Sequence, residues 1–284
     1  MMEAWPAPAK LNLFLHITGR RADGYHTLQS VFQFLDYHDD LSFDLTDNGQ
    51  VTRAMPVPGI AEENDLTVRA ARLLQQYSQC PRGAVIHLTK RLPAGAGLGG
   101  GSSDAATTLL TLNHLWGCGL DLDTLAVLGL QLGADVPVFV RGQVAWAEGV
   151  GEQLTMIDLP EPWYLVLAPP VAVSTARAFA AFDAAVQLTP ASPPITIRGF
   201  RDGRGQNDLE SVVRRLYPEV DKALTWLGKF GPTRMTGSGA CVFVPVENEA
   251  RGLEILQQCP AGLADGFVAR GVNRHPVHRR LYGE

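Results

Sequence analysis

Residues Pro93–Asp104, with the sequence PAGAGLGGGSSD, form the most glycine-dense stretch of this 284-residue chain. The apolar segment AATTLLTLNHLW (105–116) follows directly and predicts a helix. Because glycine has no Cβ atom, its backbone can approach an anion closely, and a helix N-terminus adds unpaired N–H groups and partial positive charge. Ser102 and Ser103 supply hydroxyl groups for phosphate or Mg²⁺. The stretch therefore predicts a phosphate-binding loop that opens a helix.

Of three other interpretations of this stretch, two are weaker but stay open, and the P-loop pattern fails. A flexible solvent loop does not normally end abruptly in an apolar helix. The P-loop pattern GxxxxGK[ST] needs a lysine, and none follows these glycines. The dinucleotide pattern GxGxxG matches at Gly95–Gly100, but its acidic residue should close a second strand. The acid at the expected distance, Asp121, instead stands where another helix is predicted to begin.

Strand and helix patterns follow one another irregularly along the chain, which favours an α+β fold over a doubly wound sheet. Lys10–Thr18 alternates as in a half-buried strand, with leucine or isoleucine at 11, 13, 15 and 17. Other strands are predicted at 31–37, 41–45, 85–92, 136–140, 143–147, 163–167, 234–235, 240–244 and 266–271. Helices are predicted from an Asn64 cap to Tyr77 and at 105–116, 122–132, 208–217, 219–229 and 247–258. Residues 187–205, rich in Pro, Thr, Gly and Arg, predict a mobile loop.

Composition and charge narrow the class of protein. Hydrophobic residues make up 46% of the chain and charged residues 19%, as in globular proteins. The net charge of −5 argues against a nucleic-acid or anionic-membrane partner, which selects a basic face. The start, MMEAWPAPAK, lacks the features of a targeting segment, and no window reaches the roughly 20 apolar residues of a membrane span. We expect a cytoplasmic protein that binds neither nucleic acid nor membranes.

Cysteine and histidine spacing gives little support for a metal centre. The four cysteines contain no CxxC pair and are expected to be reduced and buried; they are Cys80, Cys118, Cys241 and Cys259. The close histidine pair His275-x-x-His278 has no cysteine or carboxylate ligand nearby in the sequence, which disfavours zinc. The identity of any metal ligands is left open, and a metal ion is expected to arrive with a nucleotide.

The segment PAGAGLGGGSSDA resembles the second motif of the galactokinase, homoserine kinase, mevalonate kinase and phosphomevalonate kinase (GHMP) superfamily, Pro-x-x-x-Gly-Leu-Gly-Ser-Ser-Ala. The chain departs from that pattern by extra glycines before the serines and by Asp104 after them. This departure is typical of members that phosphorylate a cytidine diphosphate-linked methylerythritol in the non-mevalonate isoprenoid pathway. Residues 6–36, 132–142 and 234–244 are similar to the other motifs of these members, in the same order.

The resemblance implies a two-domain α+β kinase fold with the active site in the cleft between the domains. Residues 1–159 would form the N-terminal domain, similar to a domain of ribosomal proteins, and residues 160–284 a ferredoxin-like C-terminal domain. It also implies ATP, together with Mg²⁺, as the cofactor and a small-molecule acceptor. We expect a monomer or a weak homodimer.

Two residues are candidates for catalysis. Asp135, in Gly-Ala-Asp-Val-Pro, would by itself be read as a turn or capping aspartate. The resemblance assigns it the role of general base, because phosphoryl transfer needs a group that orients the acceptor hydroxyl and accepts its proton. Lys10 would by itself be an exposed lysine at a strand end. The resemblance places it beside Asp135, where its charge would stabilise the carboxylate and polarise the hydroxyl.

The resemblance also implies the binding residues. ATP would contact Pro93, Ala94, Gly95, Ala96, Gly97, Leu98, Gly99, Gly100, Gly101, Ser102 and Ser103. The acceptor would contact Asn12, Tyr25, His26, Thr175, Phe179 and Gly237. An aromatic sandwich of Tyr25 and Phe179 would hold the cytosine, whose edge would bond to His26. Without the family context these aromatic residues would be packing residues, Asn12 part of a solvated face, and Gly237 part of a hairpin turn; the motif match at Phe179 is the loosest.

Other functions remain as alternatives. The same kinase chemistry could serve homoserine, mevalonate or a sugar, and the cytidine-binding residues are what distinguish these acceptors. A nucleotide-sensing module on the same fold would not need both Lys10 and Asp135. A nucleic-acid-binding domain conflicts with the acidic net charge.

Overall fold

The computed structural model describes residues 3–56, 59–186 and 192–283. One ten-stranded sheet crosses the molecule in the order β3-β4-β2-β10-β7-β9-β8, with β1 and β5 also paired to β2, and β6 paired to β5. Its strands are β1 Trp5–Arg20, β2 His26–Thr46, β3 Val51–Arg53, β4 Gly83–Thr89, β5 Ala145–Glu148, β6 Gln153–Met156, β7 Trp163–Ala168, β8 Arg234–Met235, β9 Val242–Val246 and β10 Asp265–Val272.

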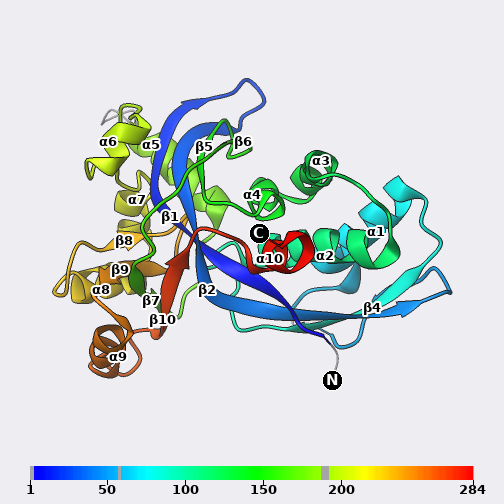
Figure 1. Ribbon diagram of the computed structural model, residues 1–284. Helices are drawn as coiled ribbons and strands as arrows, with labels where there is room; N and C mark the ends of the chain where they lie inside the picture. Colours follow the sequence, from blue (N-terminus) through cyan, green and yellow to red (C-terminus); the bar gives the residue numbers. More distant parts are fainter. Residues whose placement is uncertain (1–2, 57–58, 187–191, 284) are drawn as a thin grey trace.

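Helices pack around the sheet in two groups (Figure 1). They are α1 Leu66–Ser78, α2 Gly100–Trp116, α3 Leu122–Leu132, α4 Val136–Arg141, α5 Thr175–Val186, α6 Ile197–Arg201, α7 Glu210–Leu216, α8 Pro218–Leu227, α9 Glu249–Gln257 and α10 Pro276–Tyr282. Helices α1 to α4 lie to one side of the long strands β1 and β2, together with α10, and α5, α7 and α8 lie to the other. The expected α+β architecture is confirmed.

Helix α4 corrects one prediction, since Val136–Val140 was expected to be a strand. All five residues are buried, and the chain forms a helix that continues to Arg141. A short apolar run that is buried on every side has no periodicity by which strand and helix can be told apart. Pro137 stands in the first turn of α4, where its fixed φ and missing N–H suit a helix start.

Smaller corrections concern the first half of the chain. The strands expected at 31–37 and 41–45 are parts of the single strand β2. Helix α1 is capped by Asp65, which accepts a hydrogen bond from the Thr67 N–H, whereas Asn64 lies in a preceding 3₁₀ turn. Strand β1 is not half-buried, because every residue from Ala7 to Ile17 is buried. Tertiary packing against α2 and against side chains of β5 and α6 covers the strand.

The predicted loop 187–205 is only partly a loop. Residues 187–191 lie outside the described residues, but residues 197–201 form α6. Thr196 caps this helix by accepting a hydrogen bond from the Gly199 N–H at 3.1 Å, and Phe200 packs on Phe14. Elements that the sequence patterns did not predict are β3, β6, α5, α6 and α10. Helix α3 and strand β8 have the predicted ends, and the remaining predicted helices and strands are present with shifted ends.

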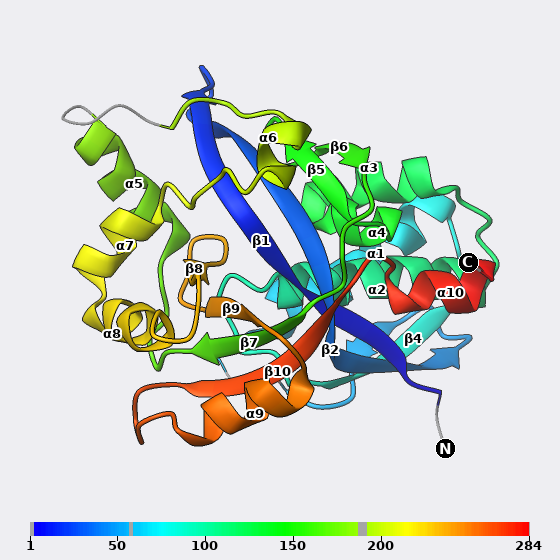
Figure 2. The same cartoon turned by 60° about the vertical axis from the view of Figure 1, so that its left-hand side comes forward.

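The two halves of the chain share the sheet through β10. This strand pairs with β7 over Asp265–Arg270 and then with β2 at Gly271 and Val272. Helix α10 follows and lies beside α2, within the first half (Figure 2). A domain boundary at Leu159 stays a prediction, and a division there separates α10 from the elements that it contacts.

Helix α10 is fastened to the end of α4. The Nε2 atom of His278 bonds to the Val140 carbonyl oxygen at 2.8 Å, and the His275 backbone N–H donates to Gly142 at 2.9 Å. A Cβ atom on Gly142 would lie 2.2 Å from the His278 ring. Complete burial holds the pKa of His275 well below its ordinary value, so this ring is neutral. The histidine pair noticed in the sequence therefore joins two helices.

No helix within the described part of the chain combines the length and the apolar character that a membrane crossing requires.

Candidate functional site

The glycine stretch forms a short loop at the N-terminus of α2. Gly95, Gly97 and Gly99 have φ angles of +64°, +79° and +71°, a region that residues with a Cβ atom rarely adopt. Helix α2 begins at Gly100, earlier than predicted, so Ser102 and Ser103 lie in its first turn. The left-handed glycines and the helix start give the loop the backbone geometry of an anion-binding site.

A cavity of about 740 Å³ opens beside this loop. It is lined by the loop residues 93–101, by the start of α1 at 64–67 and by side chains that include Lys90, Ser102 and Asp104. Its volume lies within the range of cofactor-sized pockets, about 300–1,000 Å³. Ser102 lines the cavity, whereas the Oγ atom of Ser103 is buried and has no partner among the described residues. Of the two predicted hydroxyl donors, Ser102 is thus the accessible one.

Lys10 and Asp135 meet at the other side of the loop. The Lys10 Nζ atom lies 3.3 Å from Asp135 Oδ2; the lysine side chain is 3% exposed and the aspartate side chain 34%. The Lys10 backbone N–H donates to the Leu98 carbonyl at 2.9 Å, and a Cβ atom on Gly99 would lie 3.0 Å from Lys10 Cε. Asp135 occupies the N-cap position of α4 but makes no side-chain capping bond. Its carboxylate is therefore available at the edge of the phosphate loop.

Residues of three separate motifs hold this arrangement together. The Asn12 backbone N–H donates to Thr236 Oγ1 at 2.9 Å, and that hydroxyl donates to the Gly97 carbonyl at 3.1 Å. The Asn12 side chain accepts a hydrogen bond from Lys10 Nζ and donates to Ser30 Oγ at 2.8 Å. Asn12 is buried, not solvated, and both ends of its amide have protein partners. The geometry fits a residue that positions Lys10.

Gly237 lies against the phosphate loop. Its φ angle is +57°, and a Cβ atom there would lie 3.2 Å from the Gly97 carbonyl oxygen. The neighbouring Ser238 hydroxyl is 2.8 Å from Thr175 Oγ1 at the start of α5. The motif at residues 234–244 thus contacts both the glycine loop and the helix that presents the predicted acceptor residues.

The aromatic residues predicted for cytosine are brought to one region, but they do not form a sandwich here. The Tyr25 side chain is 67% exposed. Phe179 of α5 stacks instead on the His26 ring, with centroids 4.8 Å apart and an interplanar angle of 21°. His26 Nε2 is 2.6 Å from Asp183 Oδ1, also on α5. The roles of Tyr25, His26, Thr175 and Phe179 stay predictions.

Comparison with known proteins identifies the family. Residues 65–143 match the model of the GHMP kinases N terminal domain, and residues 196–265 match that of the GHMP kinases C terminal domain. A protein of Thiobacillus denitrificans named 4-diphosphocytidyl-2-C-methyl-D-erythritol kinase is 55% identical over 278 residues, which are 98% of each chain. The chain belongs to the GHMP kinase family. It is an ATP-dependent phosphotransferase with a small-molecule substrate.

Other relatives agree with this assignment. The protein of the same name from Pseudomonas syringae is 55% identical, with 97% of this chain and 96% of the relative covered. A crystal structure of 4-(cytidine 5'-diphospho)-2C-methyl-D-erythritol kinase matches with a TM-score of 0.82 and 32% identity, covering 95% of this chain and 99% of its own. Mevalonate kinase of Methanococcus jannaschii, 16% identical with a TM-score of 0.68 over 96% of this chain, shares the fold.

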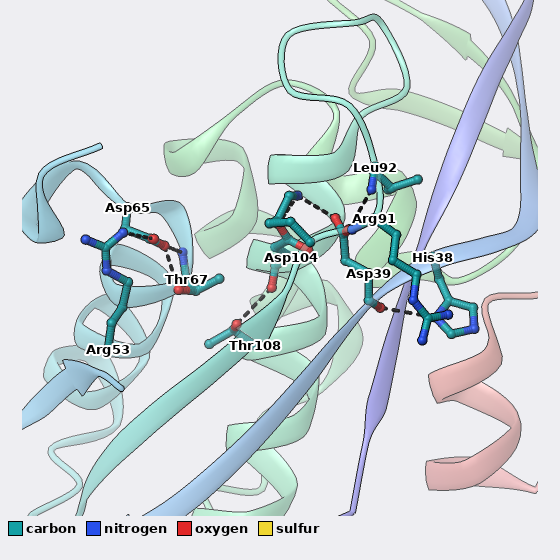
Figure 3. A network of polar contacts seen from close by, with 10 residues as sticks. His38, Asp39, Arg53, Asp65, Thr67, Arg91, Leu92, Asp104 and Thr108 are labelled. Atoms are coloured by element: carbon teal, nitrogen blue, oxygen red, sulfur yellow. Dashed lines mark hydrogen bonds and ion pairs between the residues drawn. The ribbon is translucent and has the colours of Figure 1, made fainter. Parts of the chain in front are cut away.

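A buried ionic network that sequence patterns did not reveal lies beside the glycine loop of this GHMP kinase (Figure 3). Asp39 of β2 is fully buried and accepts hydrogen bonds from the backbone N–H groups of Arg91 and Leu92 at 2.5 and 2.8 Å. The Lys90 ammonium donates to Asp39 and, at 2.8 Å, to Asp104 of α2. The same ammonium lies 3.4 Å from where a Cβ atom on Gly100 would be. The network fixes the entry of the chain into the phosphate loop.

Asp104 has an unusual protonation equilibrium. Burial raises its pKa to about 7; the Lys90 charge opposes this rise, and the neighbouring Asp39 carboxylate adds to it. Its second oxygen, Oδ1, is buried without a partner among the described residues. A carboxyl group that gains a proton near neutral pH therefore stands beside the start of the phosphate loop.

The Asp104→Asn variant tests this linkage through stability. In unfolded chains an aspartate has a pKa of about 3.9, so between that pH and about 7 the folded protein binds the extra proton. The stability that the folded protein gains by protonating Asp104 is fully present below pH 4 and is lost as the pH rises through 7. As the pH is raised from 4 to 7, the free energy of unfolding of Asp104→Asn minus that of wild type should increase by up to about 1.4 kcal/mol per pH unit. Urea unfolding at several pH values measures it.

Asp47→Asn, at an exposed turn after β2, is the matched control and should leave the pH dependence of stability unchanged. Parallel stability curves for wild type and Asp104→Asn between pH 4 and 7 would contradict the raised pKa.

Proposed function

We propose that this kinase transfers the γ-phosphate of ATP to the C2 hydroxyl of 4-diphosphocytidyl-2-C-methyl-D-erythritol. The observation that carries the proposal is that full-length relatives 54–56% identical to this chain are named as kinases of this compound. The juxtaposition of the phosphate loop with the Lys10–Asp135 pair supports it, because both halves of a phosphoryl transfer site are present in one place. The reaction would belong to the non-mevalonate isoprenoid pathway.

The proposed mechanism is direct, in-line transfer. Asp135 accepts the proton of the attacking hydroxyl, and its partly exposed carboxylate can reach a bound acceptor. The buried Lys10 ammonium lies within 3.3 Å of that carboxylate and next to Gly99, so it can stabilise charge on both the acceptor oxygen and the transferred group. Backbone N–H groups at the start of α2 hold the β- and γ-phosphates. No covalent phospho-enzyme is needed, because these groups act by positioning and charge.

Mg²⁺ fits the residues present. Magnesium bound with a nucleotide usually takes one or two protein oxygens, several waters and the phosphates themselves. The Ser102 hydroxyl lines the cavity and Asp104 keeps a buried oxygen without a partner, so oxygen ligands lie near the loop. The described residues include no cluster of three or more histidine, cysteine or acidic side chains, and the ion would be held mainly by ATP. When bound, Mg²⁺ would neutralise charge that develops on the phosphates.

The acceptor would be recognised through its cytidine. Tyr25 at the β1–β2 turn offers an exposed ring on which a base can stack, and Phe179 faces the same region from α5. A base held between them requires the Phe179 side chain to exchange its stacking on His26 for stacking on the base. The expectations of a monomer or weak homodimer and of a cytoplasmic location stay part of this proposal.

A coupled ADP-release assay with a panel of alcohols tests the proposal. Turnover should require the cytidyl group. Mevalonate, homoserine and simple sugars should therefore react at a small fraction of the rate of the cytidyl-linked substrate. Tyr25→Ala should raise KM for the cytidyl-linked substrate about 10- to 100-fold with a smaller effect on kcat, because base–aromatic stacking contributes about 1–3 kcal/mol per base. The control Tyr77→Ala removes another exposed tyrosine, at the far end of α1. Equal rates with mevalonate or homoserine, or an unchanged KM in Tyr25→Ala, would refute the assignment.

A further inference from the structure

Two side chains of helix α5, Phe179 and Asp183, contact the imidazole of His26. Asp183 Oδ1 lies 2.6 Å from His26 Nε2, and the Phe179 ring lies parallel to the imidazole at 4.8 Å. Phe179 and Asp183 are four residues apart, so they project from the same face of α5. The His26 side chain is only 11% exposed. Asp183 therefore fixes the direction of the Nε2 atom, and Phe179 packs on the ring until a base takes its place.

The contact with Asp183 decides which ring nitrogen bears the proton. An ionised carboxylate can only accept hydrogen bonds, and a neutral imidazole has one N–H group and one lone pair. At 2.6 Å from an ionised carboxylate, Nε2 bears a proton, and in the neutral ring Nδ1 then offers a lone pair. Among the described residues none bonds to Nδ1. In the neutral ring the free position is thus a hydrogen-bond acceptor.

Arg20 keeps Asp183 in this role. Its Nη1 atom lies 3.2 Å from Asp183 Oδ2, so the guanidinium engages one carboxylate oxygen and leaves the other to His26. Arg20 is the last residue of β1 and His26 is the first of β2, and the two are paired in the antiparallel register. The carboxylate therefore bridges both strands of the hairpin, and the chain Arg20–Asp183–His26 behaves as one positioning unit.

We propose that Asp183, through the tautomer of His26, makes this kinase select cytosine over uracil in its acceptor; this rests on the proposed function. Cytosine presents an exocyclic amino group, a donor, where uracil presents a carbonyl oxygen, an acceptor. A ring lone pair can accept from the amino group but opposes the lone pairs of the carbonyl. A site built to hydrogen-bond one polar group discriminates strongly against an analogue that leaves its atoms unpaired. Asp183 is a positioning residue in this scheme, because it acts through His26.

Equilibrium binding of CDP and UDP tests the inference without turnover. Wild type should bind CDP about 10- to 100-fold more tightly than UDP. In Asp183→Asn the side-chain amide can donate to Nε2, which frees the proton to move to Nδ1, so the ratio of affinities should fall by about 10-fold or more. Asp183→Glu keeps a carboxylate and should keep the preference for CDP. If Asp183 had only a structural role, its replacement would weaken the binding of CDP and UDP alike and leave the ratio of their affinities unchanged.

Asp44→Asn is the matched control, since Asp44 forms another aspartate–histidine pair, with His87 at 2.9 Å, on the exposed far part of β2 and β4. Its ratio of affinities should equal that of wild type. Nitrogen–proton correlation spectra of protein with isotope-labelled histidine report the tautomer directly and should show His26 protonated at Nε2 in wild type.

Equal binding of CDP and UDP by wild type, a preference unchanged in Asp183→Asn, or a His26 proton on Nδ1 would each overturn the inference. If the CDP preference depends on Asp183 but the cytidyl-linked alcohol is not phosphorylated, the proposed function fails and the inference on base selection stands.

Discussion

Replacing Asp135 by asparagine should lower kcat by about 10²- to 10⁴-fold while the KM values for ATP and for the acceptor change little. Asparagine keeps the size of the side chain and its position at the N-cap of α4, so the structure around it is retained. It cannot accept the hydroxyl proton, and it removes the carboxylate that lies 3.3 Å from Lys10 Nζ. The coupled ADP-release assay with saturating substrates measures the effect.

A second aspartate that contacts α4 provides the control. Asp123 pairs with Arg141 at the other end of that helix and is largely exposed, so Asp123→Asn should keep wild-type kcat. When Asp135 is replaced in a Lys10→Met background, kcat should fall by a much smaller factor than when Asp135 alone is replaced, because the two residues act on the same proton transfer. An Asp135→Asn variant with wild-type kcat would show that the general base has been wrongly assigned.

The second large effect is expected for Gly97→Ala. A Cβ atom there would lie 2.2 Å from the Thr236 carbonyl oxygen, a backbone atom that has little freedom to move, and the φ angle of +79° is strained for alanine. The loop must shift away from Thr236, and a displacement of about 1 Å can cost on the order of 10²-fold in rate. We expect kcat/KM for ATP to fall by about that factor. Initial rates at varied ATP concentrations measure it.

Gly117→Ala separates the clash from the backbone strain. Gly117 follows α2 with a φ angle of +71°, but a Cβ atom there has no neighbour within 4 Å. This variant should lose about 1–2 kcal/mol of stability and retain kcat/KM. If Gly97→Ala retained wild-type kcat/KM as well, the contact between the phosphate loop and Thr236 would be irrelevant to ATP use.

The glycine loop before a helix could be predicted because its signal is local. Consecutive glycines before an apolar helix specify backbone geometry within about a dozen residues, whatever the rest of the chain does. The predicted start of the helix, at residue 105, is wrong because the apolar run begins there, whereas the helix starts at Gly100, directly after the left-handed Gly99. Local patterns placed the loop correctly and its boundary less well.

Helix α4 shows where pattern reading fails and what would have corrected it. A run of five buried apolar residues fits a central strand as well as a buried helical turn. The start signals of a helix were present, because Asp135 precedes the run and Pro137 stands within its first turn. Weighing those two residues above the apolar run would have favoured a helix and placed Asp135 at its N-terminus.

The polar networks could not be predicted, because their members are distant in sequence. His26 and Asp183 are separated by 157 positions, and Asp39 and Lys90 by 51. Each residue taken alone reads as an ordinary surface charge, and Asp183 lies on a helix that no pattern predicted. Family resemblance supplied the motif residues Lys10 and Asp135, but it gave no information on the side chains that position their neighbours. Such pairs emerge only once the fold brings the strands and helices together.

The attachment of α10 to α4 also concerns inhibition. The side chain of His278 and the backbone of His275 hold the carboxyl-terminal end of the short helix whose other end bears Asp135. Separation of these two helices would loosen the end of α4 opposite Asp135, and with it the position of the carboxylate beside the Lys10 ammonium. A compound that separated them would be expected to lower turnover from a place outside the cavity beside the glycine loop.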